Sequence, residues 1–195
     1  MPALSRTLTL ADAAMPRAGF LQNALLVVAA SLLTAAAAQL EIRLPWTPVP
    51  VTGQTFAVLL TGVVLGARRA FLAQALYLFQ GACGLPFFAG GAAGVLVLAG
   101  PTGGYLVAFP FAALVTGALA ERAWDRRPVT MFLAMLLGST VIFAAGLAQL
   151  SRFVPANALV ATGLAPFVAG DVIKSALAAL AFPFAWKFVR GLEAK

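Results

Sequence analysis

The chain has 195 residues, of which 62% are hydrophobic and only 10% are charged, with a formal net charge of +7 and no histidine. A soluble domain averages about 25% charged residues, so this composition predicts an integral membrane protein. The lack of histidine excludes imidazole catalysis and histidine metal sites, and the single cysteine excludes an internal disulfide, so we expect neither a metal nor a cofactor.

Six apolar segments follow one another along the chain, each close to the roughly 20 residues that a membrane-spanning helix needs. They are residues 24–40, 51–67, 70–85, 105–120, 129–148 and 167–186. The sequence therefore predicts an all-α, polytopic integral membrane protein with six transmembrane helices in a single domain, residues 21–190. Residues 1–20 and 191–195 are predicted to be cytoplasmic tails.

The lysine and arginine residues fit this layout when both termini are placed in the cytoplasm. Ten of the 13 then lie inside, Arg43 and Arg152 lie in outer loops, and Lys174 lies within the sixth span. This distribution obeys the positive-inside rule and favours a bacterial-type plasma membrane. Because the basic residues are scattered between apolar runs, we expect contact with membrane lipid and not with nucleic acid. A cleaved signal peptide is the competing interpretation of the first span.

The first two outer loops differ from ordinary connectors. The first, residues 43–50, holds three prolines and is predicted to be stiff. The second, residues 81–104, holds eight of the 18 glycines, and glycine lets a backbone approach a ligand closely. A flexible or tightly packed loop is the alternative. The candidate ligand-binding residues in and beside the second loop are Gln80, Phe88, Gly90, Gly91, Thr102, Gly103, Gly104 and Tyr105.

Two charged residues, Asp171 and Lys174, lie within the sixth span. They are three positions apart and therefore share one helix face, which Ala178 and Ala181 continue with small side chains. An ionisable residue at the middle of a membrane helix costs about 2.5–3.5 kcal/mol, so such residues are by default functional. An internal salt bridge that fixes helix packing is the alternative. We predict that this face points inward and that both residues bind a ligand.

Several motifs together resemble the BioY family, the biotin-binding S components of energy-coupling factor (ECF) vitamin transporters. They are PVPVTGQT at residues 48–55, LYL at 76–78, GACGLP at 81–86, GPTGGY at 100–105, and Gly170-Asp171 with Lys174. The resemblance covers residues 30–174 and implies the S-component fold, with high-affinity capture and uptake of biotin near the outer surface.

The resemblance also implies roles for residues and partners. From the chemistry of biotin we hypothesise that Asp171 would accept hydrogen bonds from the ureido N–H groups and that Lys174 would bind the ureido carbonyl or steady Asp171; the sequence leaves open which end of biotin meets this pair. Backbone N–H groups, helped by Arg152, would hold the carboxylate. The implied partners are a transmembrane T component and two cytoplasmic ATPase subunits. Small residues on the first helix would contact the T component, here Ala30, Thr34 and Ala38, with Thr34 in place of an alanine.

Other functions remain open at this stage. The chain has no Walker A motif, so it would rely on partners for ATP hydrolysis, or act as a stand-alone biotin carrier without ATPase partners. An S component for another vitamin, such as thiamine or riboflavin, is the main alternative ligand class. An intramembrane enzyme is not expected, because Asp171 is the only intramembrane carboxylate and Cys83 has no histidine beside it.

Overall fold

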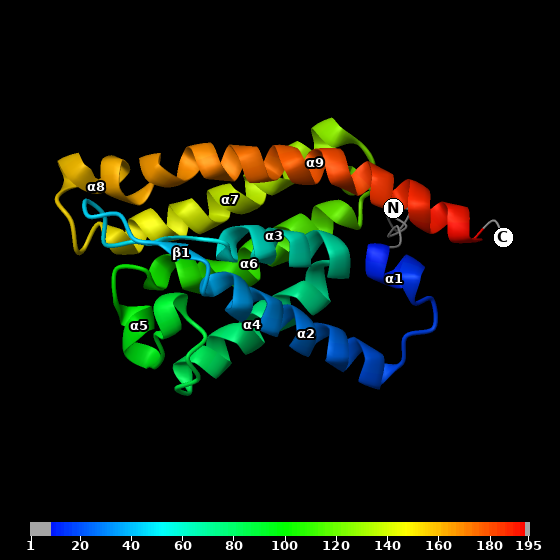
Figure 1. Cartoon of the computed structure of the whole chain (residues 1–195), viewed down its shortest axis with the longest axis horizontal. Helices are drawn as coiled ribbons and strands as arrows, with labels where there is room; N and C mark the ends of the chain where they lie inside the picture. Colours follow the sequence, from blue (N-terminus) through cyan, green and yellow to red (C-terminus); the bar gives the residue numbers. More distant parts are fainter. Residues whose placement is uncertain (1–8, 194–195) are drawn as a thin grey trace, which may run out of the picture.

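The computed structural model describes residues 9–193, and this part of the chain is mostly α-helical (Figure 1). The helices are α1 (Leu10–Ala14), α2 (Phe20–Ala38), α3 (Gln54–Leu65), α4 (Ala67–Ala82), α5 (Val95–Ala99), α6 (Gly103–Ala120), α7 (Pro128–Leu150), α8 (Ala156–Gly163) and α9 (Ala165–Glu193). Strands β1 (Glu41–Ile42) and β2 (Val51–Thr52) and the 3₁₀ turns η1 (Ala89–Gly91) and η2 (Trp124–Arg126) lie between them.

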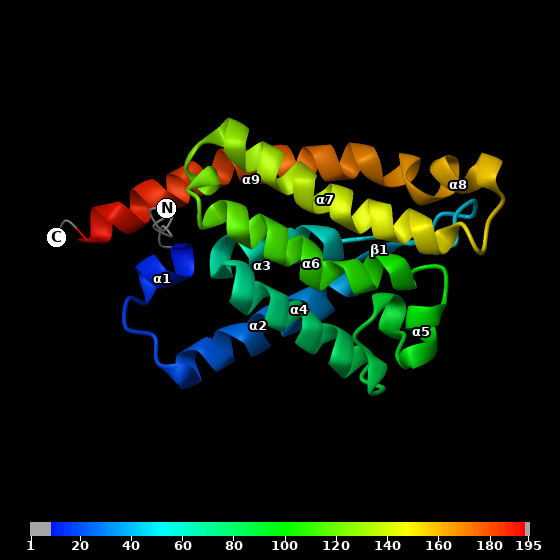
Figure 2. The same ribbon diagram turned by 180° about the vertical axis from the view of Figure 1, so that it is seen from behind.

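The long helices form a bundle with two distinct ends (Figures 1 and 2). Helix α1 and the last turns of α9 lie at one end, which we call the terminal end. The hairpin β1–β2, α5 and α8 lie at the opposite end, which we call the loop end. The two views agree on this placement, so the irregular outer segments of the sequence gather on one side of the bundle.

Each predicted span coincides with a helix, but the second and third helices are short. Helices α3 and α4 have 12 and 16 residues, and Gly66, with a φ of 81°, separates them. Four described segments are long and apolar enough to cross a membrane: Phe20–Ala38, Gly103–Ala120, Pro128–Leu150 and Ala156–Lys187. The second span was predicted too early because Val51 and Thr52 pair with Ile42 and Glu41 in an antiparallel hairpin.

Helix α6 occupies the centre of the bundle. In the apolar 18-residue stretch of α6, 67% is buried inside the protein. The corresponding share for α2, which lies at the edge of the bundle, is 17%. Small residues allow its neighbours to approach closely, as is usual for membrane helices. A Cβ on Gly117 of α6 would collide with the backbone of Gly66 and Ala67, where α3 ends and α4 begins.

The small-residue face of α2 packs within the chain. Ala30, Thr34 and Ala38 are all buried, and Gln74 of α4 donates a 3.1 Å hydrogen bond from Nε2 to Thr34 Oγ1. The spacing of small residues permits close approach either within the chain or to another protein, and the family resemblance implies a partner. In the structure this face is buried within the chain, and α4 contacts it at Thr34.

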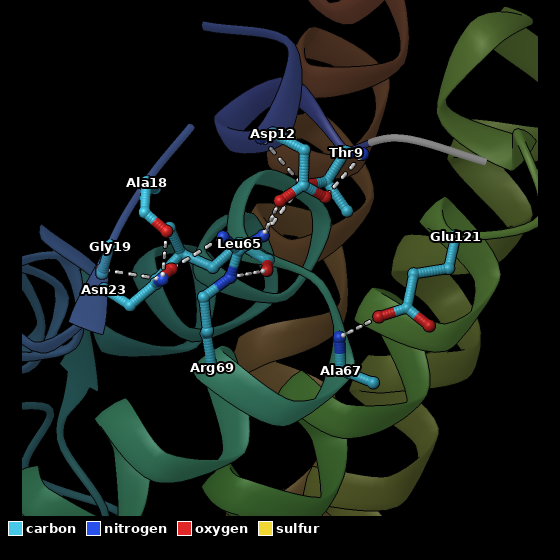
Figure 3. Close-up of polar contacts among 9 residues, drawn as sticks. All are labelled: Thr9, Asp12, Ala18, Gly19, Asn23, Leu65, Ala67, Arg69 and Glu121. Carbon is cyan, nitrogen blue, oxygen red and sulfur yellow. Dashed lines mark hydrogen bonds and ion pairs between the residues drawn. The ribbon is translucent and has the colours of Figure 1, made fainter. Parts of the chain in front are cut away.

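Arg69 joins four helices at the terminal end (Figure 3). Its guanidinium contacts Asp12 Oδ1 at 2.7 Å, Asn23 Oδ1 at 3.1 Å and the Leu65 carbonyl at 2.7 Å. Thr9 and Asp12 form a capping box that starts α1. The predicted N-terminal tail, residues 1–20, therefore contains a docked helix, and its residues 1–8 lie outside the described part. Of the predicted C-terminal tail, residues 191–193 continue α9, and 194–195 lie outside the described part.

Candidate functional site

A cavity of about 430 Å³ opens at the loop end of the bundle. This volume lies in the range of small-molecule sites, which is about 300–1,000 Å³. Its walls come from the hairpin region at residues 41–52, from η1, and from the first turns of α3, α6 and α9. Segments that are far apart in the sequence thus meet around one space.

Helix α9 places Asp171 and Lys174 in the wall of this cavity. Asp171 is only 7% exposed, and Lys174 lies three positions further along the same helix. Lys174 donates a 3.1 Å hydrogen bond from Nζ to the carbonyl oxygen of Thr52. Among the described residues no ion pair joins Asp171 to Lys174, so the two groups do not form the internal salt bridge that the sequence left as an alternative.

The buried side of α9 differs in part from the predicted one. Ala178 is buried as expected, but Ala181 is exposed, and the inward positions are instead Ser175, Ala178 and Phe182. The buried positions 171, 175, 178 and 182 are three or four residues apart, as one face of an α-helix requires. Asp171 still lies on the inward side.

A chain of hydrogen bonds fixes the polar wall opposite α9. Thr52 Oγ1 donates to Gln54 Oε1 at 3.2 Å, and Gln54 Nε2 donates to the hydroxyl oxygen of Tyr77. The Tyr77 hydroxyl in turn donates to the carbonyl of Phe87 at 3.2 Å. This network joins the hairpin to α3, α4 and the glycine-rich loop, and it holds the carbonyl that receives Lys174.

Aromatic rings form the apolar part of the cavity wall. Phe88 is 1% exposed, and Tyr105 and Phe143 both lie against Phe167, with ring centroids 6.4 and 6.2 Å away. The Tyr105 hydroxyl donates a 2.8 Å hydrogen bond to the carbonyl of Gly163. Tyr105 lines the cavity, but its hydroxyl group already has a partner within the protein.

An ion pair lies on the exposed side of the cavity. Arg43 Nε donates to Glu41 Oε1 at 2.9 Å, and both residues line the cavity. The Arg43 side chain is 73% exposed and that of Glu41 is 17% exposed. Gly90, with a φ of 63°, lies directly against the pair, because a Cβ there would contact Arg43 Nη2 and Glu41 Oε1.

The family of the chain follows from comparison with known proteins. A model of the BioY family matches residues 7–191. The chain belongs to the BioY family. The expectation drawn from the motifs is thus confirmed over nearly the whole length of the chain.

Curated BioY relatives match most of the chain. A probable biotin transporter BioY of Pyrococcus horikoshii is 38% identical over 148 residues, which cover 76% of this chain and 86% of the relative. The biotin transporter BioY of Rhizobium etli is 40% identical over 147 residues, covering 71% and 79%. That of Thermotoga maritima is 42% identical over 141 residues, covering 71% and 82%.

A solved structure has the same fold. It is described as the S component for biotin from an ECF-type ABC transporter, and it superposes on the BioY chain with a TM-score of 0.71. The match covers 90% of this chain and 92% of that one at 22% sequence identity. At this identity the comparison shows the S-component fold and does not define the site.

The structure brings five of the predicted ligand residues together around the cavity. These are Phe88, Thr102, Tyr105, Asp171 and Lys174. They come from the glycine-rich loop and the adjoining start of α6, and from α9, which lies more than 60 positions further along the sequence. That these five residues bind the ligand stays a prediction.

Two of the predicted glycines pack helices together and do not line the cavity. A Cβ on Gly104 would collide with the Ala145 carbonyl of α7, and one on Gly103 with the Leu98 carbonyl. Gln149 of α7 ties this junction by donating to the Leu98 carbonyl at 2.9 Å. The GPTGGY motif thus places Thr102 and Tyr105 by letting α6 approach α7 closely.

Three further predicted residues also lie outside the cavity wall. Gln80 is half-buried on α4, Gly91 is exposed on η1, and Gly90 acts through the ion pair described above. Arg152, the suggested carboxylate ligand, is exposed on the turn between α7 and α8 and does not line the cavity. Spacing alone does not reveal which face of a loop or turn meets the ligand.

Sequence reasoning missed several residues of the site. Gln54 and Phe109 both line the cavity. Gln54 belongs to the PVPVTGQT motif, but the sequence did not predict it as a ligand-binding residue, and it did not predict Phe109 of α6 either. Glu41 and Arg43 were also missed as a site. Their signal was present, because they are an acid and a base two positions apart in an otherwise apolar outer segment.

Proposed function

We propose that this chain captures biotin in the loop-end cavity and carries it across the membrane as the substrate-binding S component of an ECF-type transporter. Membership of the BioY family and curated relatives named biotin transporters support this function. The chain is a multi-pass protein of the plasma membrane, and its family is one of transporters and not of enzymes.

The observation that carries the proposal is that buried Asp171 and half-buried Lys174 both line a cavity whose wall also holds aromatic rings. Biotin offers a ureido ring with two N–H donors and one carbonyl acceptor, next to an apolar ring and chain. Asp171 accepts the ureido N–H groups, and Lys174 donates to the ureido carbonyl while Thr52 holds its ammonium. Phe88, Tyr105 and Thr102 enclose the apolar rings. Burial strengthens such charge-assisted hydrogen bonds.

Six helices of this fold cross the membrane in our proposal, with both termini in the cytoplasm. Four segments have the length and composition for a span, and the shorter α3 and α4 complete the set. An even number of crossings agrees with α1 and the end of α9 lying at the same end of the bundle (Figure 1). The terminal end also carries most of the arginines and lysines, which favours the cytoplasmic side.

Energy for transport comes from partner subunits in this proposal. The chain has no Walker A motif, and the related structure is the S component of an ECF-type ABC transporter. A T component and two ATPase subunits are therefore the proposed partners. Cells that express the chain should take up labelled biotin only when these subunits are expressed as well. ATP-independent uptake by the chain alone would instead support a stand-alone carrier.

A competition assay with a panel of vitamins tests the ligand. Labelled biotin is bound to the purified chain, and unlabelled biotin, thiamine and riboflavin compete for it. Biotin should displace the label at the lowest concentration, and the other two vitamins should need at least about a hundredfold more. Displacement by thiamine or riboflavin at a comparable concentration would show that the ligand class is wrong.

A further inference from the structure

We propose that the Arg43 guanidinium is the subsite for the carboxylate of the ligand, held in place by Glu41 and by the absence of a side chain at Gly90. This inference rests on the proposed function and deepens it, because it assigns the second polar end of the ligand to a residue. It also replaces Arg152, which lies away from the cavity.

The cations in the cavity wall leave few choices for a carboxylate. In the described part of the chain, Arg43 and Lys174 are the basic residues that line the cavity. Lys174 is already bonded to the Thr52 carbonyl and adjoins the buried carboxylate of Asp171. A second carboxylate there would face the charge of Asp171 at close range. Arg43 also has a carboxylate neighbour, Glu41, but its side chain is 73% exposed and only Nε is bonded to Glu41, so the other guanidinium nitrogens can meet a second carboxylate beside water.

The contacts of Arg43 leave two of its guanidinium nitrogens available for a ligand. The structure describes one hydrogen bond of this side chain, from Nε to Glu41 Oε1, so Nη1 and Nη2 remain to grip a carboxylate with two donors. The other carboxylate oxygen of Glu41, Oε2, is buried against the protein without a hydrogen-bond partner in the described residues. Glu41 is thus largely buried beside the cavity and holds Arg43 through Oε1, while the Arg43 side chain is 73% exposed.

Gly90 provides a second, independent observation. Its φ of 63° is a conformation that favours glycine, and a Cβ there would meet Arg43 Nη2 and Glu41 Oε1. Gly91 follows with a φ of 74°, yet a Cβ on it would meet nothing within 4 Å. The backbone is thus equally unusual at both glycines, but only Gly90 is needed to make room for the ion pair.

The two polar ends of the cavity match the two polar ends of biotin. The ureido ring needs both donors and acceptors away from water, and Asp171 with Lys174 supplies them at a site that is 7% exposed at Asp171. The carboxylate remains charged and benefits from staying partly hydrated. The flexible aliphatic chain of biotin, between its ring system and its carboxylate, lets the carboxylate reach the exposed Arg43 side chain. Ligands that lack the carboxylate would keep the ring contacts and lose only this one.

Isothermal titration of four purified proteins with biotin and with biotin amide, which lacks the charge, tests the inference. Wild type should bind biotin about tenfold more tightly than the amide. Arg43→Gln should weaken biotin about tenfold and leave the amide unchanged, which abolishes the preference. Arg152→Gln should retain the wild-type preference. Gly90→Ala should weaken biotin more than the amide.

Two further measurements complete the design. Gly91→Ala is the matched control for backbone strain and should retain the preference for biotin. Thermal unfolding of each variant checks that it is folded. If Arg43→Gln keeps the wild-type preference, or if Lys174→Met is the variant that abolishes it, the carboxylate subsite is elsewhere. If wild type binds neither compound, the proposed function itself fails, so the two failures are distinguishable.

Discussion

Asp171 and Lys174 show how scarcity of charge locates a site in a membrane protein. A charged group inside a bundle is costly, so it persists where it has a partner or a task. The structure places both groups in a cavity wall and leaves no direct ion pair between them among the described residues. Their position was predictable because only 10% of the residues in this sequence are charged.

Substitution of either residue should weaken binding. Asp171→Asn removes an anionic acceptor, and Lys174→Met removes a cationic donor of similar length. Each loses a charge-assisted hydrogen bond worth about 1.5–3 kcal/mol, so calorimetry should show biotin affinity at least about tenfold lower. Val172→Ala, on the exposed side of α9, is the matched control and should bind as wild type does. A folded Asp171→Asn or Lys174→Met variant with unchanged affinity would refute the site.

Tyr105 illustrates what the sequence could not reveal about a residue. Its ring faces the cavity, but its hydroxyl reaches the Gly163 carbonyl at the end of α8, 58 positions away. No local pattern predicts that contact, because it depends on how the α7–α8 turn folds back over α6.

The Tyr105→Phe variant should therefore lose stability more than affinity. It leaves a buried carbonyl without its donor, which costs about 1–3 kcal/mol of unfolding free energy. The apparent unfolding temperature should fall, while the biotin dissociation constant should change by less than about threefold. A large loss of affinity at unchanged stability would mean that the hydroxyl contacts the ligand instead.

At the scale of elements, helix positions were predictable and helix ends were not. Long apolar runs predicted where the helices lie, and the predicted ends of α6 and α7 agree with the structure within a few residues. The hairpin β1–β2 shortened α3, and its two-residue strands carry no periodic signal. The small-residue spacing on α2 predicted close helix approach, but it could not decide between a helix of the same chain and a partner protein.

Close approach of α6 to α7 should be sensitive to a single methyl group. Gly104→Ala places a Cβ against the Ala145 carbonyl and only 2.7 Å from the Gln149 Cβ. Overpacking of this kind costs about 1–3 kcal/mol, so thermal unfolding in detergent should occur at a lower temperature. Gly170→Ala, a helical glycine with nothing within 4 Å of its Cβ, is the control and should be neutral or slightly stabilising. Equal effects of the two substitutions would contradict this packing.

Docking of α1 should depend on Arg69 and on pH. Burial raises the pKa of Asp12, but hydrogen bonds from Thr9 and the Arg69 guanidinium outweigh it, so its pKa lies below the ordinary 3.8. A lowered pKa gives stability that is present above the unfolded value and is lost as the pH falls through the folded value. Arg69→Ala should therefore lower the unfolding temperature most near neutral pH, and the difference should shrink below about pH 4.

Arg68→Ala is the matched control for Arg69→Ala. Arg68 is the neighbouring residue on α4, it has the same charge and it is exposed. It should change the unfolding temperature little at any pH. A difference between Arg69→Ala and wild type that stays constant between pH 7 and 3 would show that Asp12 does not contribute through its charge.

At the scale of the whole molecule, composition and charge distribution predicted the class and the orientation, and the motifs predicted the family. The family match confirms the predicted family, and the fold match confirms the S-component fold, whereas the orientation stays a prediction. The number of crossings and the placement of the ends are proposals, because α3 and α4 are too short to qualify by length alone. Loop contacts at the cavity were the least predictable part, since glycine-rich segments have no preferred periodicity.

The single cysteine of the chain provides a direct test of orientation. Cys83 is exposed at the C-terminal end of α4, on the loop end. A membrane-impermeant maleimide added to intact cells should label it. In a Cys83→Ser background, Arg152→Cys should also react from outside, and Arg127→Cys should react only after the cells are permeabilised. The reverse pattern would invert the proposed topology.

A crystal structure of the purified chain with bound biotin tests the central proposal most directly. It should show biotin in the loop-end cavity, with its ureido ring in hydrogen-bond contact with Asp171 and Lys174 and its carboxylate directed toward Arg43. Biotin bound at another place, or bound in this cavity without contact to Asp171 and Lys174, would contradict the proposed site.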